Sequence, residues 1–245
     1  MPKMLVQDME QFKQTVHGTF TFSAVRPDTL TEVKYTLATV VVDITGSVAS
    51  FADELLNCLK VAANACKESP QIDNILFRAL TFNTITYELH GFKPLSSVDP
   101  DKDYRSFNPQ DLTAVYDATY DAIGAAIDYG ELLVDQKYKV NIVCVIVTDG
   151  EDNRSKLSPA DIANRVDKAL KTEKIESITT ILVGVNAKDC LHQLETFKNE
   201  ANLAHFIDAG DATPKKLAKL AQFISKSISS TSAKLGQGVA PSITF

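Results

Sequence analysis

The sequence predicts an α/β fold: a doubly wound, Rossmann-like and mostly parallel sheet of about six strands with helices on both faces. Three observations predict it. Apolar, β-branched runs recur along the chain of 245 residues, amphipathic segments separate them, and one run at 84–90 alternates apolar and polar side chains. Continuous apolar runs are typical of strands that are covered on both faces, whereas alternation is typical of an edge strand.

The parallel strands are expected where apolar residues run together. These runs are 35–42, 75–82, 140–148, 178–185 and the shorter 204–207. Only Asn83 separates the run at 75–82 from the alternating run at 84–90. The alternating run is therefore predicted to return as a hairpin and to form one antiparallel edge strand.

Helices are expected between the strands. Apolar residues recur at helical spacing over 48–69 and 113–129. Two further helices are predicted to begin at Ser158-Pro159 and Thr213-Pro214, where a capping hydroxyl precedes a proline at the first helical position. A loop is expected over 94–111.

The chain divides into a main domain at 31–231 and two flanking segments. The N-terminal extension at 1–30 is predicted as a short helix followed by a strand, and 232–245 forms a C-terminal tail. The strand at 18–25 (GTFTFSAV) and the terminal SITF are both β-prone. They are expected either to pair as added strands or to leave the tail unstructured.

Composition excludes several classes of function. The net charge is −6 and the pI is near 5.3, without an obvious basic face, so nucleic acid and anionic membranes are not expected as partners. No apolar run is long enough to span a bilayer, and the N-terminus lacks the apolar block of a signal peptide. The four cysteines lack metal or redox spacing and the four histidines are scattered. We therefore expect reduced cysteines and a cytoplasmic protein.

Oxygen-bearing side chains follow two of the predicted strands. Asp43, Thr45 and Ser47 come after the first, Asp149 comes after the strand at 140–148, and Thr113 begins a helix between them. Ligands of parallel sheets bind beyond the carboxyl ends of the strands, so these loops are expected to meet. Carboxylate and hydroxyl oxygens suit a hard cation. Two carboxylates leave room for water, which favours Mg²⁺, with Ca²⁺ or Mn²⁺ as alternatives.

Three segments together resemble the metal-ion-dependent adhesion site of the von Willebrand factor A family. They are VVDITGS at 41–47, LTAVYDA at 112–118 and IVTDGEDN at 146–153. The family's motif is D-x-S-x-S, then a Thr in a later loop, then an Asp after a core strand. The resemblance extends over 35–230 and includes the order of the predicted elements.

The resemblance implies that Asp43, Thr45, Ser47, Thr113 and Asp149 bind the cation. In the family the hydroxyls usually contact the metal directly, the aspartates often act through water, and one position is left for an acidic residue of a protein partner. This implies a non-catalytic, cation-dependent protein-binding module. Bacterial stand-alone members often work beside AAA+ ATPases, kinases or stress-response proteins, so we expect an intracellular stress or regulatory assembly.

Two positions depart from the family's motif. Thr45 stands where the family prefers Ser, and it keeps the hydroxyl. Asp111-Leu112 stands where a Gly-rich pair usually precedes the Thr. Asp111 is predicted to cap the following helix, with added negative charge at the rim of the site as the alternative.

Three other interpretations remain open. A haloacid-dehalogenase-type phosphatase would use Asp43 as a nucleophile around Mg²⁺, but it needs a second carboxylate where Thr45 stands. A scaffold of the same fold would bind no metal. Taken singly, the residues 43–47 could be a helix-capping turn, and Asp149-Gly150 a simple turn.

Overall fold

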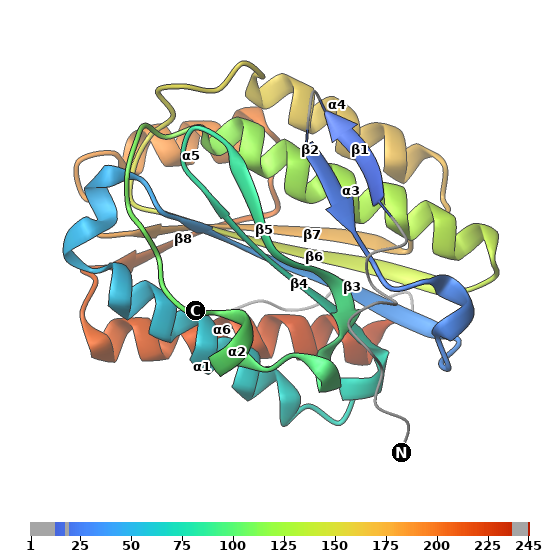
Figure 1. Cartoon of the computed structure of the whole chain (residues 1–245). Helices are drawn as coiled ribbons and strands as arrows, with labels where there is room; N and C mark the ends of the chain where they lie inside the picture. The colour runs from blue at the N-terminus through green and yellow to red at the C-terminus, as the bar shows by residue number, and fades with distance from the viewer. Residues whose placement is uncertain (1–12, 18–19, 237–244) are drawn as a thin grey trace.

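The structure is a computed structural model that describes residues 13–17, 20–236 and 245. Its main sheet has six strands in the order β5-β4-β3-β6-β7-β8 (Figure 1). Only β4 and β5 pair antiparallel; the other neighbours in this sheet are parallel. The predicted fold class is confirmed. The strands are β3 (Lys34–Asp43), β4 (Ile75–Phe82), β5 (Thr86–Pro94), β6 (Lys139–Thr148), β7 (Ser177–Val185) and β8 (His205–Gly210).

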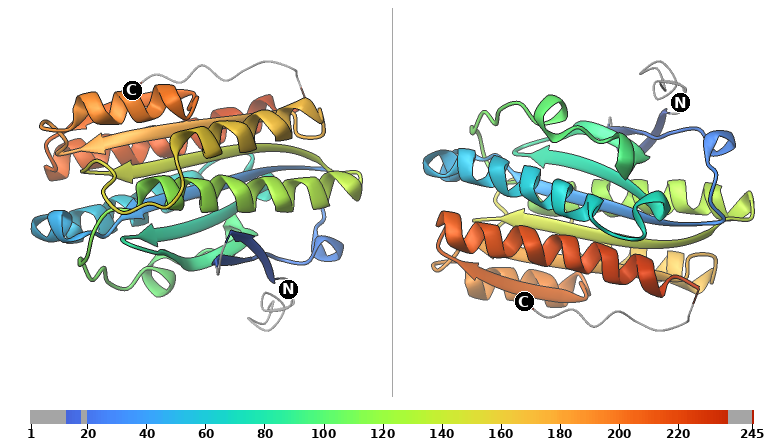
Figure 2. Two further views of the ribbon diagram at one scale, coloured as in Figure 1. Left: turned by 90° about the horizontal axis from the view of Figure 1, so that it is seen from above. Right: turned by 90° about the horizontal axis from the view of Figure 1, so that it is seen from below.

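Helices cover both faces of the sheet, as Figure 2 shows from above and from below. One layer contains α3 (Val115–Asp135), α4 (Pro159–Lys171) and α5 (Leu191–Glu200). The other contains α1 (Ala52–Lys67), the short α2 (Pro100–Asp103) and α6 (Pro214–Lys234). Each layer packs its apolar side chains onto one face of the sheet, which gives two hydrophobic cores. Burial on both faces is the reason why the strands are almost continuously apolar.

Local chemistry explains where two of the helices begin. At α4 the Ser158 amide donates to the Asp161 carboxylate at 2.8 Å, and Pro159 occupies the first position. At α6 the Thr213 hydroxyl accepts from the Lys216 amide at 3.4 Å, followed by Pro214. Both predicted starts are confirmed.

The helix predicted over 48–69 is divided. Residues Gly46–Ser50 form a 3-10 turn, η3, and α1 begins only at Ala52. Phe51 separates them because its backbone, at φ −141° and ψ 23°, is not helical. Further 3-10 turns are η2 (Pro27–Thr29), η4 (Ile72–Asn74) and η5 (Leu95–Ser97).

The N-terminal extension contributes a small second sheet. β1 (Lys13–His17) pairs antiparallel with β2 (Phe20–Ser23), so the predicted strand is present. The Phe22 side chain is buried in the core under α3, and Ala24 bridges to Phe92 of β5. Residues 1–12, where a preceding helix would begin, lie outside the described residues.

Most of the C-terminal tail, including the serine, isoleucine and threonine of SITF, lies outside the described residues. Phe245 is described, and its ring centroid lies 5.2 Å from that of Phe223 on α6. In the part of the chain that the structure describes, no helix is both long and apolar enough to cross a membrane.

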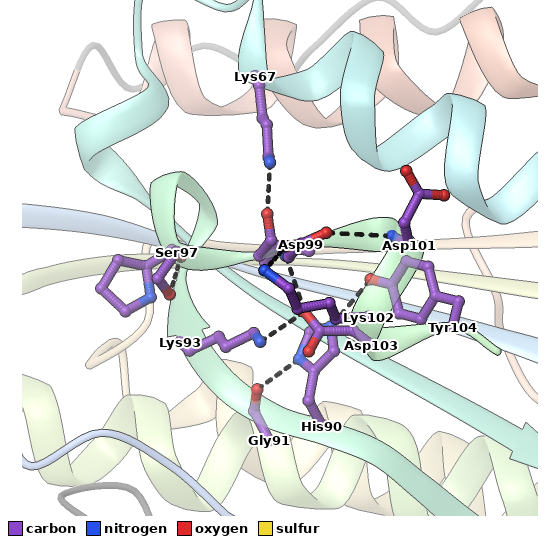
Figure 3. Close-up of polar contacts among 12 residues, drawn as sticks. Lys67, His90, Gly91, Lys93, Ser97, Asp99, Asp101, Lys102, Asp103 and Tyr104 are labelled. Carbon is purple, nitrogen blue, oxygen red and sulfur yellow. Dashed lines mark hydrogen bonds and ion pairs between the residues drawn. The ribbon is translucent and has the colours of Figure 1, made fainter. Parts of the chain in front are cut away.

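The segment predicted as a loop over 94–111 contains η5 and α2, and polar contacts hold it against β5 and α1 (Figure 3). His90 on β5 contacts the Tyr104 hydroxyl through Nε2 at 2.9 Å. Lys93 donates to the Asp103 carboxylate at 2.6 Å, and Lys67 of α1 donates to the Val98 carbonyl. His90 therefore has a structural role, and burial lowers its pKa to about 4.

Replacement of Asp103 with alanine should destabilise the protein. It leaves the buried Lys93 ammonium without its carboxylate and frees the Asp99 amide, which donates to the same carboxylate at 2.8 Å. We expect the free energy of unfolding, measured with urea at pH 7, to fall by about 2–3 kcal/mol.

Asp101→Ala is the matched control, because Asp101 pairs with Lys60 at 3.1 Å but its side chain is 89% exposed. Its loss should change the unfolding free energy by less than about 0.5 kcal/mol. Equal effects of the two substitutions would contradict the structural role of the Lys93–Asp103 pair.

Candidate metal site

The site lies where β3 and β6 end side by side. The two strands pair in parallel up to Val42 and Val147, so the loops that follow them begin at the same edge of the sheet. Asp43, the last residue of β3, is fully buried. Its Oδ1 accepts from the Thr45 amide at 2.8 Å and its Oδ2 from the Thr148 hydroxyl at 2.6 Å. The Asp43 carboxylate is therefore fixed by groups of both loops.

Hydroxyl groups extend this contact toward solvent. The Thr45 and Ser47 hydroxyl oxygens lie 3.0 Å apart, and the Ser47 hydroxyl donates to Oδ1 of Asp149 at 2.9 Å. Thr45 is buried, Asp149 is half-buried and Ser47 is exposed. Four of the five predicted residues thus form one hydrogen-bonded chain that opens to solvent at Ser47.

Thr113 is joined to the loop after β6 by hydrogen bonds of its backbone. Its amide donates to Oδ1 of Asn153 at 2.9 Å, and the Asn153 amide donates to the Thr113 carbonyl at 3.0 Å. These bonds join the start of α3 to the loop after β6, which also contains Asp149. Among the described residues, the Thr113 hydroxyl makes no hydrogen bond to the other four predicted ligands.

Asp111 does not cap a helix, so that prediction is wrong. The residue before α3 is Ala114, and Asp111 lies in a turn with φ +66°. Its carbonyl accepts from the Gly46 amide at 3.2 Å, and its carboxylate accepts from the Asn83 side chain at 3.3 Å. Glycine adopts this left-handed backbone most readily, and Asp is among the other residues that tolerate it best.

The helix-capping interpretation of 43–47 is also wrong. Thr45 precedes η3, yet its side chain makes no capping hydrogen bond, and α1 begins after Phe51. The Thr45 and Ser47 hydroxyls instead face each other and Asp149.

Both carboxylates are held in surroundings that disfavour their charge. Burial raises the pKa of Asp43 to about 6, with a further increase from the nearby Asp149, although bonds from Thr148 and Thr45 oppose it. Burial also raises the pKa of Asp149, against the bond from Ser47. No Lys or Arg among the described residues forms an ion pair with either carboxylate. A cation bound between them would therefore stabilise both charges.

The oxygens gathered here are of the kind that a hard cation prefers. The Thr45 and Ser47 hydroxyl oxygens lie 3.0 Å apart, and the Ser47 hydroxyl lies 2.9 Å from Asp149, which are ordinary hydrogen-bond lengths. Hydroxyl and carboxylate oxygens suit Mg²⁺, Ca²⁺ or Mn²⁺. Within the described residues, no group of three or more His, Cys, Asp or Glu side chains could hold a metal ion. The candidate site therefore depends on its hydroxyl oxygens.

Sequence reasoning missed several residues that organise the site. Thr148 fixes the Asp43 carboxylate, Asn153 fixes Thr113, and the Cys190 thiol donates to the Asp149 carbonyl at 3.3 Å. Thr148 and Asn153 both lie in the motif segment IVTDGEDN, so the sequence could have marked them as candidates. It could not have predicted the contact of Cys190 with Asp149, because Cys190 follows a different strand.

Comparisons with known proteins bear on the fold. No family model matches the chain, and no curated protein matches it. The chain is similar to the PilB minor pilin from Streptococcus sanguinis (TM-score 0.57, 16% identity, 86% of this chain and 64% of that one). It is similar to proximal thread matrix protein 1 from the mussel byssus (TM-score 0.54, 17% identity, 80% and 47% coverage). It is also similar to the pilus adhesin SpaC from Lactobacillus rhamnosus GG (TM-score 0.55, 10% identity, 82% and 31% coverage).

These similarities show that the chain has the von Willebrand factor A fold, as the motifs predicted. A further structure of the mussel protein is described as having a zinc-occupied metal-ion-dependent adhesion site, and its TM-score is 0.51 at 17% identity. The chain spans less than two thirds of the length of each of these proteins.

The backbone at Asp111 gives a test of the turn that leads to Thr113. Asp111→Gly and Asp111→Ala both remove the carboxylate that contacts Asn83, but only alanine keeps a Cβ at φ +66°. Alanine should therefore be less stable than glycine by about 1 kcal/mol in urea unfolding. Equal stability of the two variants would show that the left-handed turn is not maintained in solution.

Proposed function

We propose that this chain is a non-catalytic binding domain that holds a divalent cation and uses it to bind an acidic side chain of a protein partner. The cation ligands are Asp43, Thr45, Ser47, Thr113 and Asp149. The observation that carries the proposal is the hydrogen-bonded chain from the buried Asp43 to Asp149, which becomes exposed at Ser47. This series of hydrogen bonds brings oxygens from two separate loops to one solvent-accessible point.

Each group has a distinct part in this function. The Thr45, Ser47 and Thr113 hydroxyls provide neutral oxygens, and Asp43 and Asp149 provide negative charge. Thr148 and Asn153 orient Asp43 and the Thr113 backbone. When bound, the cation supplies a positive centre that a partner carboxylate can ligate, which is a charge-assisted contact.

We propose Mg²⁺ as the cation, because two carboxylates and three hydroxyls leave coordination positions for water, which Mg²⁺ retains readily. Ca²⁺ and Mn²⁺ accept the same kind of oxygen ligands and stay alternatives.

The geometry disfavours the phosphatase alternative. A nucleophilic aspartate must reach the substrate phosphorus, whereas Asp43 is fully buried and both of its oxygens accept hydrogen bonds. The residue two positions later is Thr45, which cannot protonate a leaving group as a carboxylic acid would. A cytoplasmic location stays a prediction from composition, and an AAA+ ATPase, kinase or stress-response partner stays a prediction from the resemblance.

Isothermal titration of Mg²⁺ into the wild type and Asp43→Asn tests the site. The substitution keeps the shape and an acceptor for Thr148 but removes one charge, so the affinity should fall by about tenfold or more. Ca²⁺ should bind the wild type more weakly than Mg²⁺.

Glu151→Gln is the matched control, since it removes a charge from the same loop at an exposed position outside the predicted ligands. Its affinity should stay close to the wild-type value. If the wild type gave no heat with Mg²⁺, Ca²⁺ or Mn²⁺, the metal-free scaffold would be the better description. If Asp43→Asn bound Mg²⁺ with the wild-type affinity, the assignment of Asp43 as a ligand would be wrong.

A generic aryl phosphate tests the enzymatic alternative. With Mg²⁺ present, we expect no release of the aryl alcohol above the rate in buffer, because Asp43 is inaccessible. Metal-dependent turnover that disappears in Asp43→Asn would establish the phosphatase and overturn the non-catalytic assignment.

A further inference from the structure

Two exposed apolar side chains, Ile85 and Leu112, lie beside the candidate metal site. Their exposed fractions are 58% and 51%, and among the described residues only Val33, at 74%, is a more exposed large hydrophobic residue. Leu112 directly precedes Thr113, and Ile85 lies in the turn between β4 and β5. A single exposed apolar side chain is ordinary at a protein surface, whereas neighbouring ones beside a binding site indicate a contact with a partner.

The buried Asn83 holds together the two segments that carry these side chains. Its carbonyl accepts from the Ala114 amide at 2.9 Å, and its side-chain amide donates to the Asp111 carboxylate at 3.3 Å. Its Oδ1 accepts from the Ile85 amide at 3.2 Å, and its own backbone amide donates to the Ile85 carbonyl at 3.1 Å. Ile85 and Leu112 are therefore carried by one hydrogen-bonded unit rather than by two independent loops.

A pocket of about 550 Å³ adjoins this unit. Its apolar lining residues are Phe20, Ile85 and Ala114, and Ala114 directly follows Thr113. The volume is within the range of ligand-binding pockets. An apolar side chain that contacts Ile85 can therefore extend into this pocket.

The acidic side chains that line the pocket are engaged or covered within the protein. Asp117 accepts from two backbone amides of the loop after β6 at 2.9–3.1 Å. Glu88 pairs with the buried Arg78 at 2.9 Å. Asp121 is 5% exposed and accepts from the Thr86 hydroxyl at 2.8 Å. These carboxylates therefore do not make the pocket a site for a positively charged ligand.

The basic side chains at the rim of the pocket are exposed. They are Arg154 and Lys156, and in the part of the chain that the structure describes neither forms an ion pair. Arg154 directly follows Asn153, whose side chain accepts from the Thr113 amide. A cation bound at the metal site would add positive charge on the same side. Negative charge on a ligand is therefore favoured here.

We propose that Ile85 and Leu112 form an apolar docking surface for a partner segment in which an apolar side chain stands next to the acidic residue that ligates the cation. The apolar side chain packs on Ile85 and Leu112 and extends toward the pocket, while Arg154 and Lys156 attract the negative charge of the segment. Burial of apolar area adds affinity to the contact between carboxylate and metal. This inference rests on the proposed function, because the acidic residue of the segment needs the cation.

Three peptides test the docking surface when they are titrated into the full chain with Mg²⁺ present. They are Ac-Leu-Asp-Leu-NH₂, Ac-Gly-Asp-Gly-NH₂ and Ac-Leu-Asn-Leu-NH₂, and binding is followed by the NMR shifts of the Ile85 and Leu112 methyl groups. The first peptide should bind about fivefold more tightly than the glycine peptide, or better, because its leucine side chains are buried on the surface. The asparagine peptide should bind more weakly than the first, because it lacks the carboxylate.

A double variant, Ile85→Ser with Leu112→Ser, should lose the preference for leucine. Both side chains are exposed, so their replacement leaves the hydrophobic cores intact. Val33→Ser is the matched control, since Val33 is also exposed but precedes β3, at the end of that strand opposite Asp43. This control should keep the full preference for leucine.

Equal affinity of the leucine and glycine peptides for the wild type would overturn the docking surface, even if the double variant failed to fold. So would a leucine preference that survives in the double variant, or the absence of methyl shifts with every peptide. The calorimetric Mg²⁺ titration without peptide would stand in each of these cases. Conversely, if that titration failed, a leucine preference measured in EDTA and lost in the double variant would keep the docking surface and overturn only the metal site.

Discussion

The parallel pairing of β3 with β6 is the constraint on which the candidate site depends. It brings the ends of two strands that are distant in sequence to the same edge of the sheet. The hydrogen bond from Thr148 to Asp43 then joins the two loops at their bases. The positions of the Thr45 and Ser47 hydroxyls and of the Asp149 carboxylate, which lie nearer to solvent, depend on this contact between the two loops. A one-residue change of register would turn these side chains away from each other.

The segment that leads from β5 to Thr113 is held by contacts along its length. The His90–Tyr104 and Lys93–Asp103 contacts hold its first part, and the left-handed turn at Asp111 follows. The bond from the Gly46 amide to the Asp111 carbonyl brings this turn against the first loop. The position of Thr113 is therefore a product of tertiary contacts over the whole segment, and Asn153 fixes it from the other side.

Two carboxylates that form no ion pair with a Lys or Arg among the described residues, Asp43 and Asp149, lie together at this end of the molecule, where the Ser47 hydroxyl joins their loops. Buried charge without a partner is costly, so such groups mark places where a ligand can return stabilisation. The hydroxyl oxygens beside these two carboxylates make a metal ion the ligand that suits this place.

The sequence by itself determined the strands, the parallel sheet with one antiparallel edge, and the helix starts at Ser158 and Thr213, because hydrophobic periodicity and capping are local signals. It also predicted Asp43, Thr45, Ser47 and Asp149 as candidate ligands, because the end of a strand is marked in the sequence by a change from apolar to polar residues. The structure connects these four residues by hydrogen bonds. Only the tertiary structure decided the left-handed conformation of Asp111 and the contacts that hold Thr113. A backbone angle and the contacts between separate loops are set by residues that are far apart in sequence, so no local pattern predicts them.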